Sequence, residues 1–179
     1  MPNLMTAEEL FEMGNSQRCE LIKGEYIAMS PSGGTHGRLT NKMGRIIGNF
    51  IEEKNLGEGF GAETGFILSR NPDTVRAPDF AFIAKERLTL IDEFDQFLSI
   101  APDLAVEVVS PGDLWTKIEK KIKDFLHAGV RLIWVINRSN KTIHVYHGFS
   151  DVRVLTESDH LTGEDVLPGF SIPVKRIFE

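Results

Sequence analysis

Two acidic residues lie in β-prone surroundings where carboxylates are uncommon: Asp79 in the segment RAPDFAFI and Glu107 in the segment PDLAVEVVS. An ionised carboxylate among apolar neighbours is costly unless a cation or hydrogen bonds compensate its charge. Two such groups that converge on one place also repel each other, and a hard divalent cation such as Mg²⁺ relieves that repulsion. The pair therefore predicts a metal site.

Glu107 is the less expected of the two acids because it lies in the middle of a predicted strand over 103–109. Side chains alternate between the two faces of a strand, so Glu107 shares a face with Ala105 and Val109. A surface glutamate on an edge strand is the simpler alternative. Since buried charges are usually paired or metal-bound, the Val-Glu-Val-Val context favours a functional carboxylate.

A lysine-rich amphipathic helix is expected over 113–128 and is closed by Gly129. At about 100° of rotation per residue, its apolar arc comprises Leu114, Trp115, Ile118, Ile122, Phe125 and Leu126. Lys121 falls at the rim of this arc and can reach towards Glu107, whereas Lys117, Lys120 and Lys123 lie further from it. The alternative is that Lys121 packs its stem on the core and keeps its amine in water.

Two further residues are candidates for the same site. Glu20 lies on the first strand of a hairpin whose turn is Lys23-Gly24, and is either an exposed strand carboxylate or a third acid. His36 begins a helix expected over 36–54, after the glycine-rich SPSGGTHG loop. A satisfied, partly buried histidine is the more usual account of His36, although free N–H groups at a helix start also suit a phosphate.

The order of the predicted elements indicates an α/β or α+β fold. The expected strands after the first hairpin are about 59–68, 77–84, 103–109, 131–136, 141–147 and 152–155. The strand–helix–strand unit over 103–136 is long enough for a right-handed parallel crossover. No repeat or linker interrupts residues 1–179, so we expect a single domain with a mixed central sheet flanked by helices.

Composition restricts the class of protein. The chain has 179 residues, a net charge of −6 and one cysteine, Cys19, which fits a reducing compartment. No segment has the apolar length to span a bilayer and no signal-peptide pattern is visible, so a cytoplasmic protein is expected. The negative charge argues against non-specific coating of nucleic acid, but not against a nuclease whose carboxylates are neutralised by metal.

Other chemistries are disfavoured by the sequence. A P-loop, a dinucleotide fingerprint, an HExxH motif and a zinc-type Cys/His cluster are all missing from it. Hydrolysis of a glycoside by the paired carboxylates would leave Lys121 without a role, and no aromatic platform for a sugar is evident.

Several segments together resemble a known bacterial family. They are ELIKGE at 20–25, SPSGGTH at 30–36, RAPD at 76–79, VEVVSPGD at 106–113, KIKDFLHAGVRLIWVI at 121–136 and LTGEDVLPGFSIPV at 161–174. Pro78-Asp79 followed by Glu107 resembles the PD-(D/E)XK signature. The whole set is similar to the bacterial putative restriction endonuclease family of the restriction-endonuclease-like superfamily.

The resemblance implies a nuclease core with a mixed central sheet, helices on its faces and added hairpins. Asp79, Glu107 and the main-chain carbonyl of Val108 would hold Mg²⁺ or Mn²⁺. Val109 stands where the signature has lysine, and an apolar side chain there can neither orient a water nor stabilise charge. The resemblance places that lysine on the following helix at Lys121, which the helical periodicity also selects.

The resulting hypothesis is a metal-dependent endonuclease that hydrolyses phosphodiester bonds in DNA. Its catalytic residues would be Asp79, Glu107, Lys121 and Glu20, and His36 would contact a substrate phosphate. A homodimer is expected by analogy with nucleases that cut both strands. The alternative is a nuclease-fold domain that has lost its chemistry and binds nucleic acid or a protein partner, which Val109 favours and the intact acids disfavour.

Overall fold

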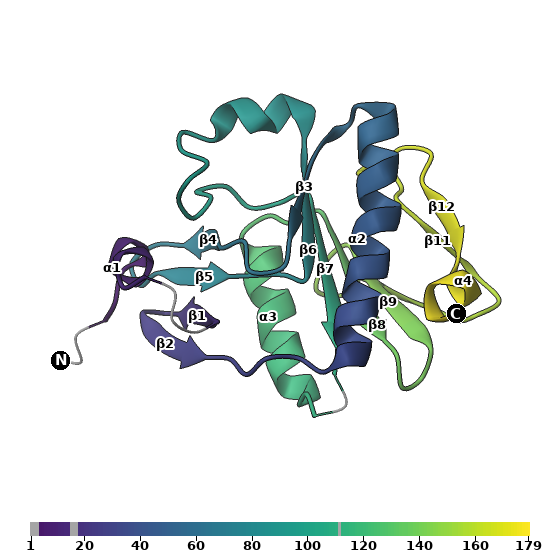
Figure 1. The fold of residues 1–179 in the computed structure, drawn as a ribbon, viewed down its shortest axis with the longest axis horizontal. Coiled ribbons are helices and arrows are strands. Elements are labelled where there is room, and N and C mark those ends of the chain that lie inside the picture. Colours follow the sequence, from purple (N-terminus) through teal and green to yellow (C-terminus); the bar gives the residue numbers. More distant parts are fainter. Residues whose placement is uncertain (1–3, 15–17, 111) are drawn as a thin grey trace.

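The computed structural model describes residues 4–14, 18–110 and 112–179 of the chain. Its largest sheet has six strands (Figure 1), in the order β10 (Val152–Leu155), β9 (Thr142–Tyr146), β8 (Leu132–Asn137), β7 (Leu104–Val109), β6 (Phe80–Ala84) and β3 (Gly57–Gly61). The β7–β8 pair is parallel and the other neighbours in this sheet are antiparallel. The mixed central sheet expected from the sequence is therefore confirmed.

The parallel pair is joined by helix α3 (Trp115–His127), which gives the crossover predicted from the sequence. β7 and β8 lie in the middle of the sheet and are covered on both faces, which explains why their sequences are almost continuously apolar. Glu107 is the one charged residue within these two strands.

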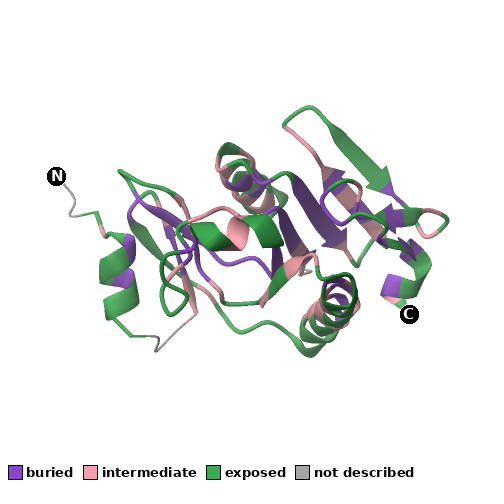
Figure 2. Ribbon diagram, turned by 90° about the horizontal axis from the view of Figure 1, so that it is seen from above, coloured by how far each residue is buried: buried purple, intermediate pink, exposed green. Residues whose placement is uncertain are grey.

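Two long helices cover the faces of the six-stranded sheet (Figure 1). α2 (Gly34–Lys54) covers one face with residues buried at three- and four-residue spacing: Leu39, Met43, Ile47 and Ile51. On the opposite face, Ile122 and Phe125 of α3 pack against Ala105 and Ile133. In Figure 2 the buried residues follow the strands, whereas the outer sides of the helices are exposed.

A four-stranded sheet lies beside the central one (Figure 1), in the order β2 (Glu25–Ala28), β1 (Cys19–Ile22), β5 (Thr74–Arg76) and β4 (Phe66–Ser69). β1 and β2 form the predicted hairpin. Lys23 and Gly24 have φ values of 51° and 79°, and a two-residue turn between twisted strands requires positive φ at both positions. The short helix α1 (Ala7–Glu12) packs on this sheet.

Two strand predictions are wrong in their boundaries. The run 59–68 is divided between β3 in the central sheet and β4 in the smaller one. The strand expected over 77–84 begins at Phe80, so Asp79 lies directly before β6 and not within it. Pro78 has no N–H to donate and restricts the preceding residue, so the chain leaves β5 at this point and crosses to the central sheet.

The start of α3 also differs from the prediction. Leu114 and Trp115 belong to the predicted apolar arc, but in the structure they are 61% and 36% exposed. The helix begins at Trp115, and its first turn is exposed. The sheet-facing arc therefore begins further along α3, where Ile118 packs on the core.

The C-terminal region contains elements that the sequence did not predict. They are β11 (His160–Thr162), β12 (Ser171–Pro173) and α4 (Val174–Phe178), and a 3₁₀-helix over Lys85–Leu90 lies earlier in the chain. This region packs against the core beneath α2 through Leu161, Ile172 and Ile177. The helices described by the structure include none with the length and apolarity needed to cross a membrane.

Candidate active site

Asp79 is held against the strand that carries Glu107. Phe80, the first residue of β6, pairs with Val106, so β7 continues past β6 and the register places Asp79 opposite Glu107. At this position the main-chain N–H of Val108 donates to Asp79 Oδ2 at 2.8 Å. The carboxylate thus takes the place of a missing strand partner, and the two acids converge at one end of the central sheet.

Lys121 reaches Glu107 from α3. Its Nζ lies 2.7 Å from Glu107 Oε1, and the two side chains are only 14% and 15% exposed. The same ammonium lies 3.0 Å from Glu20 Oε1 and donates to the carbonyl of Ala77 at 3.1 Å. Lys121 therefore connects the central sheet, the smaller sheet and the segment that leads to Asp79.

Glu20 is buried and fully engaged, so the exposed-carboxylate alternative is wrong. Arg76 Nη1 donates to its Oε2 at 2.7 Å, and the N–H of Ala77 donates to its Oε1 at 3.1 Å. Arg76 also donates to Asp124 of α3 through Nε at 2.9 Å and through Nη2 at 2.5 Å. Together with Lys121 these residues form a charge network between the smaller sheet and α3.

Sequence reasoning did not find Arg76 and Asp124. A signal for each was present: Asp124 is three residues after Lys121 and so shares its side of the helix, and Arg76 opens the RAPD motif. An isolated aspartate on a charged helix carries no indication of burial, however. Its arginine partner came from a strand that the sequence did not predict.

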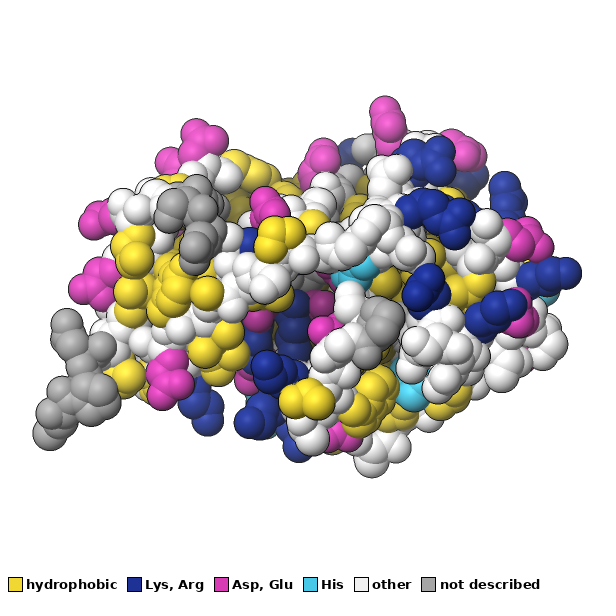
Figure 3. All heavy atoms as spheres, turned by 60° about the horizontal axis from the view of Figure 1, so that its bottom comes forward, with side chains coloured by type: hydrophobic (Ala, Val, Ile, Leu, Met, Phe, Trp, Pro, Cys, Tyr) yellow, Lys and Arg dark blue, Asp and Glu magenta, His cyan; other side chains and the backbone are white. Residues whose placement is uncertain are grey.

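His36 lies on Asp79, with Nε2 3.2 Å from Oδ2, and Arg18 Nη2 approaches Oδ1 of the same carboxylate at 3.6 Å. The histidine is thus satisfied by the acid, as the more usual account supposed, and its contact with a substrate phosphate stays a prediction. These three residues line a cavity of about 530 Å³ together with Gly37 and Gly44 of α2. Figure 3, in which the lower end of α2 comes forward, shows acidic, basic and histidine side chains meeting near the centre of this face.

The central ion pair has unusual protonation properties. Burial raises the pKa of Glu107 from 4.5 to about 8, in spite of the nearby Lys121 charge. Burial also opposes the charged form of Lys121, but the carboxylates of Glu107 and Glu20 outweigh it and raise the pKa of Lys121 to about 12. Lys121 is therefore an ammonium at neutral pH, which can stabilise negative charge but cannot accept a proton.

The other two acids remain ionised. Burial opposes the charge on Asp79, but the hydrogen bond and charge of His36 lower the pKa of Asp79 overall. Burial likewise opposes the charge on Glu20, and the charges of Lys121 and Arg76 lower its pKa. The hydrogen bond to Asp79 raises the pKa of His36.

The donor set fits a hard cation. The described residues include no group of three or more His, Cys, Asp and Glu side chains arranged to hold a metal ion. Mg²⁺ does not require one, because it is commonly held by one or two carboxylates and keeps several waters. Glu107 Oε1 is enclosed and, within the described part of the chain, has an ion contact from Lys121 but no aligned hydrogen bond. Asp79, Glu107 and the carbonyl of Val108 would supply oxygen ligands only.

Comparisons with known proteins assign the fold to a class. The crystal structure of a putative nuclease belonging to DUF820 from Anabaena variabilis superposes with a TM-score of 0.82 over 97% of each chain, at 20% sequence identity. The two proteins therefore share one fold. Residues 7–175 match the model of the Uma2 family, described as "Putative restriction endonuclease", and the chain belongs to this family. The comparison with curated proteins gives no match.

Removal of Arg76 should destabilise the protein strongly. Arg76→Ala leaves Glu20 and Asp124 without a shared cation in a buried setting, and breaking such a network costs about 3–5 kcal/mol. The free energy of unfolding from urea titration measures this loss. Lys141→Ala, which breaks an exposed pair with Glu157, is the control and should cost less than about 1 kcal/mol. Equal losses for the two variants would contradict the network.

Glu107 should also make stability depend on pH in metal-free protein. Its folded pKa lies above its unfolded value, so the unfolded state releases this proton first, and the parent loses stability as pH rises from about 4.5 to about 8. Glu107→Gln removes this loss. Its stability relative to the parent should rise between about pH 5 and 8 by on the order of 1 kcal/mol or more.

Urea titrations in the presence of a metal chelator measure this stability difference at several pH values. Glu53→Gln, at an exposed position of α2, is the control. A difference between Glu107→Gln and the parent that stays flat with pH would show that folding does not raise the pKa of Glu107.

Proposed function

We propose that this protein is a metal-dependent endonuclease that hydrolyses phosphodiester bonds in DNA. The observation that carries the proposal is the 2.7 Å contact between the Lys121 ammonium and Glu107, on a strand whose Val108 N–H also fixes Asp79. Membership of a family described as "Putative restriction endonuclease" supports the same conclusion. The proposal includes a homodimer, in which each copy cuts one strand, and the lone Cys19 supports a reducing, cytoplasmic setting.

Asp79, Glu107 and the carbonyl of Val108 would hold Mg²⁺ or Mn²⁺. When bound, such an ion supplies a Lewis acid for the phosphoryl oxygen and lowers the pKa of a bound water. The Asp79 carboxylate is held in place without a metal, because the N–H of Val108 and the ring of His36 both contact its Oδ2. The main-chain bond orients the carboxylate, so little reorganisation is needed when a cation enters.

Lys121 would stabilise the negative charge that develops on the phosphoryl group during hydrolysis. Its raised pKa keeps it protonated, which suits electrostatic stabilisation and excludes the role of general base. Glu20 contacts Lys121 and Arg76. We therefore assign Glu20 the role of holding the Lys121 ammonium in place, without contact to the reacting atoms. This narrows the role expected for Glu20, which the sequence grouped with the catalytic residues.

Two observations favour a second candidate function. The described residues hold no group of three metal-ligating side chains, and Val109 replaces the signature lysine. A nuclease-fold domain that binds nucleic acid or a partner without cleaving it would have these properties. Calorimetric titration with Mn²⁺ separates the two functions, because a binding domain need have no affinity for the ion.

Removal of either proposed metal ligand should abolish cleavage. Asp79→Ala and Glu107→Ala should each lower the rate of plasmid cleavage in Mg²⁺ or Mn²⁺ by at least about 10²-fold, because losing one charge-stabilising group typically costs that much. Both should also lose the heat of Mn²⁺ binding. Asp151→Ala, at an exposed position, is the control. The assignment fails if the folded variants cut as well as the parent.

Removal of the ammonium should separate catalysis from metal binding. Lys121→Met keeps the apolar stem and removes the charge, so we expect cleavage to fall by about 10²-fold or more while Mn²⁺ binding remains measurable. Lys120→Ala, an exposed neighbour on the same helix, is the matched control. Cleavage by Lys121→Met at the parental rate would remove Lys121 from the mechanism.

A further inference from the structure

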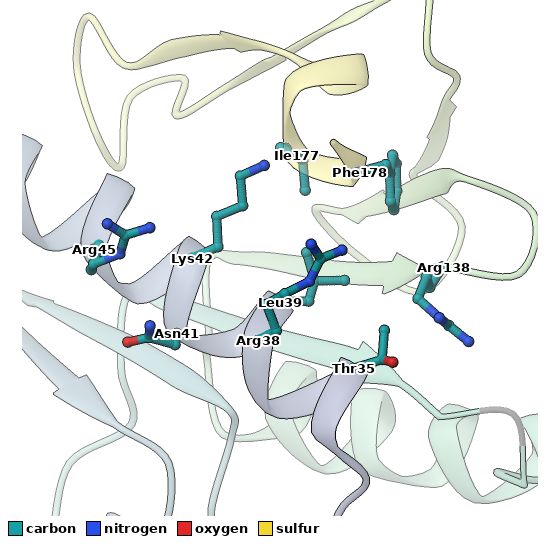
Figure 4. Close-up of a pocket in the computed structure, with 9 residues that line it drawn as sticks. All are labelled: Thr35, Arg38, Leu39, Asn41, Lys42, Arg45, Arg138, Ile177 and Phe178. Atoms are coloured by element: carbon teal, nitrogen blue, oxygen red, sulfur yellow. The ribbon is translucent and has the colours of Figure 1, made fainter.

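A second hollow lies on the other side of α2 from the candidate site. It has a volume of about 260 Å³, and four of its lining residues are basic: Arg38, Lys42 and Arg45 from α2, and Arg138 directly after β8. We call these four residues the basic groove. Figure 4 shows Lys42 extending from α2 towards α4, with Arg38 beside it and Arg45 further along the helix; α4 contributes Ile177 and Phe178 as the apolar wall.

No ion pair with a described carboxylate neutralises the positive charge of the basic groove. Within the described residues, no carboxylate lies within 4.0 Å of Arg38, Arg45 or Arg138, although the other arginines and lysines include many that form such pairs. Within the same residues, Lys42 has no carboxylate within 4.0 Å either, and it donates to the main-chain carbonyl of Arg176 at 2.5 Å. Four cations without acidic partners are a marked local excess in a chain whose net charge is −6.

The spacing of the α2 residues suits a repeating anion. Positions 38, 42 and 45 share one side of the helix. At about 1.5 Å per residue, Arg38 and Arg45 are separated by roughly 10 Å along the axis. One strand of B-DNA presents a phosphate for every 3.4 Å or so of its axis. The run therefore matches a few consecutive phosphates of a single strand, and the guanidinium groups suit phosphate oxygens because they donate in a planar fork.

The basic groove is continuous with the cavity that contains Asp79. Asn41 and Arg45 line both hollows, so the two meet along the exposed side of α2. Figure 3 shows lysine and arginine side chains gathered on the right of the same face. A backbone with one phosphate in the cavity beside His36 can continue past Arg45 into the groove without leaving the surface.

We infer that the basic groove binds the sugar-phosphate backbone of DNA next to the phosphodiester that is cut. The inference rests on the proposed function, because it names the surface that receives the substrate of that site. The partly exposed Phe178 would lie against the apolar edges of the sugars. Contacts of this kind position the duplex and carry no sequence preference.

The test compares two triple variants that each remove three exposed positive charges. Arg38→Ala, Arg45→Ala and Arg138→Ala are combined in the groove variant; Lys117→Ala, Lys120→Ala and Lys123→Ala are combined in the control variant, on the helix that covers the opposite face of the sheet. Binding to a fluorescent DNA duplex of mixed sequence is followed by anisotropy over a range of salt concentrations. A metal chelator is present throughout, so that no cleavage occurs.

The groove variant should bind the duplex at least about tenfold more weakly than the parent near 100 mM salt, and its slope of log Kd against log salt should be smaller by about 2–3. The control variant should keep the parental affinity and slope. Equal weakening of both variants would mean that only overall charge matters, and parental binding by the groove variant would mean that DNA lies elsewhere. Either result overturns the inference.

A separate measurement distinguishes this inference from the proposed function. If the parent binds DNA through the groove but never cuts it in Mg²⁺ or Mn²⁺, the proposed function fails and the binding surface stands. If the groove variant binds and cuts like the parent, the surface is wrong and the nuclease stands. A parent that binds vesicles of anionic phospholipid through the groove and ignores DNA also overturns the inference.

Discussion

The candidate site depends on one ammonium group that three parts of the chain share. Lys121 comes from α3, and its Nζ meets Glu107 of the central sheet, Glu20 of the smaller sheet and the carbonyl of Ala77. Two buried carboxylates that approach each other need a cation between them, because their desolvation and repulsion are otherwise uncompensated. The same group that would act on a phosphate therefore stabilises the arrangement of acids before any metal or substrate arrives.

Much of this arrangement is readable from the sequence. Asp79 and Glu107 stand out because carboxylates are rare inside β-prone segments, and Lys121 is selected by its angle on an amphipathic helix. The central strands, the crossover and the family are also predicted correctly. The strands, the crossover and the position of Lys121 share a local cause, because each follows from periodicity or from residue type over a short stretch of chain. The family was identified by resemblance, from segments spread along the whole sequence.

The rest depends on contacts between distant segments. Arg76 and Asp124 meet across 48 positions of sequence, and a short strand such as β5 has too few residues to show a pattern. The sequence does not predict the division of 59–68 between two sheets, because both halves look strand-like and the run reads as one strand. Leu114 and Trp115 fit the helical arc but precede the part of α3 that packs on the sheet. Periodicity predicts which side of a helix is apolar, but not at which residue the helix first contacts the sheet.

The crossing at Ala77 has a consequence for how far the site can be separated from the remainder of the molecule. A fragment running from Asp79 through α3 would contain both proposed metal ligands and Lys121, and so would include the main side chains proposed for the reaction. Yet the main chain of Ala77, two residues before Asp79, is bonded on one side to Glu20 and on the other to Lys121. The N-terminal hairpin is therefore part of the support of the candidate site, and transferring or permuting the core without this hairpin would lose the contacts that position the segment before Asp79.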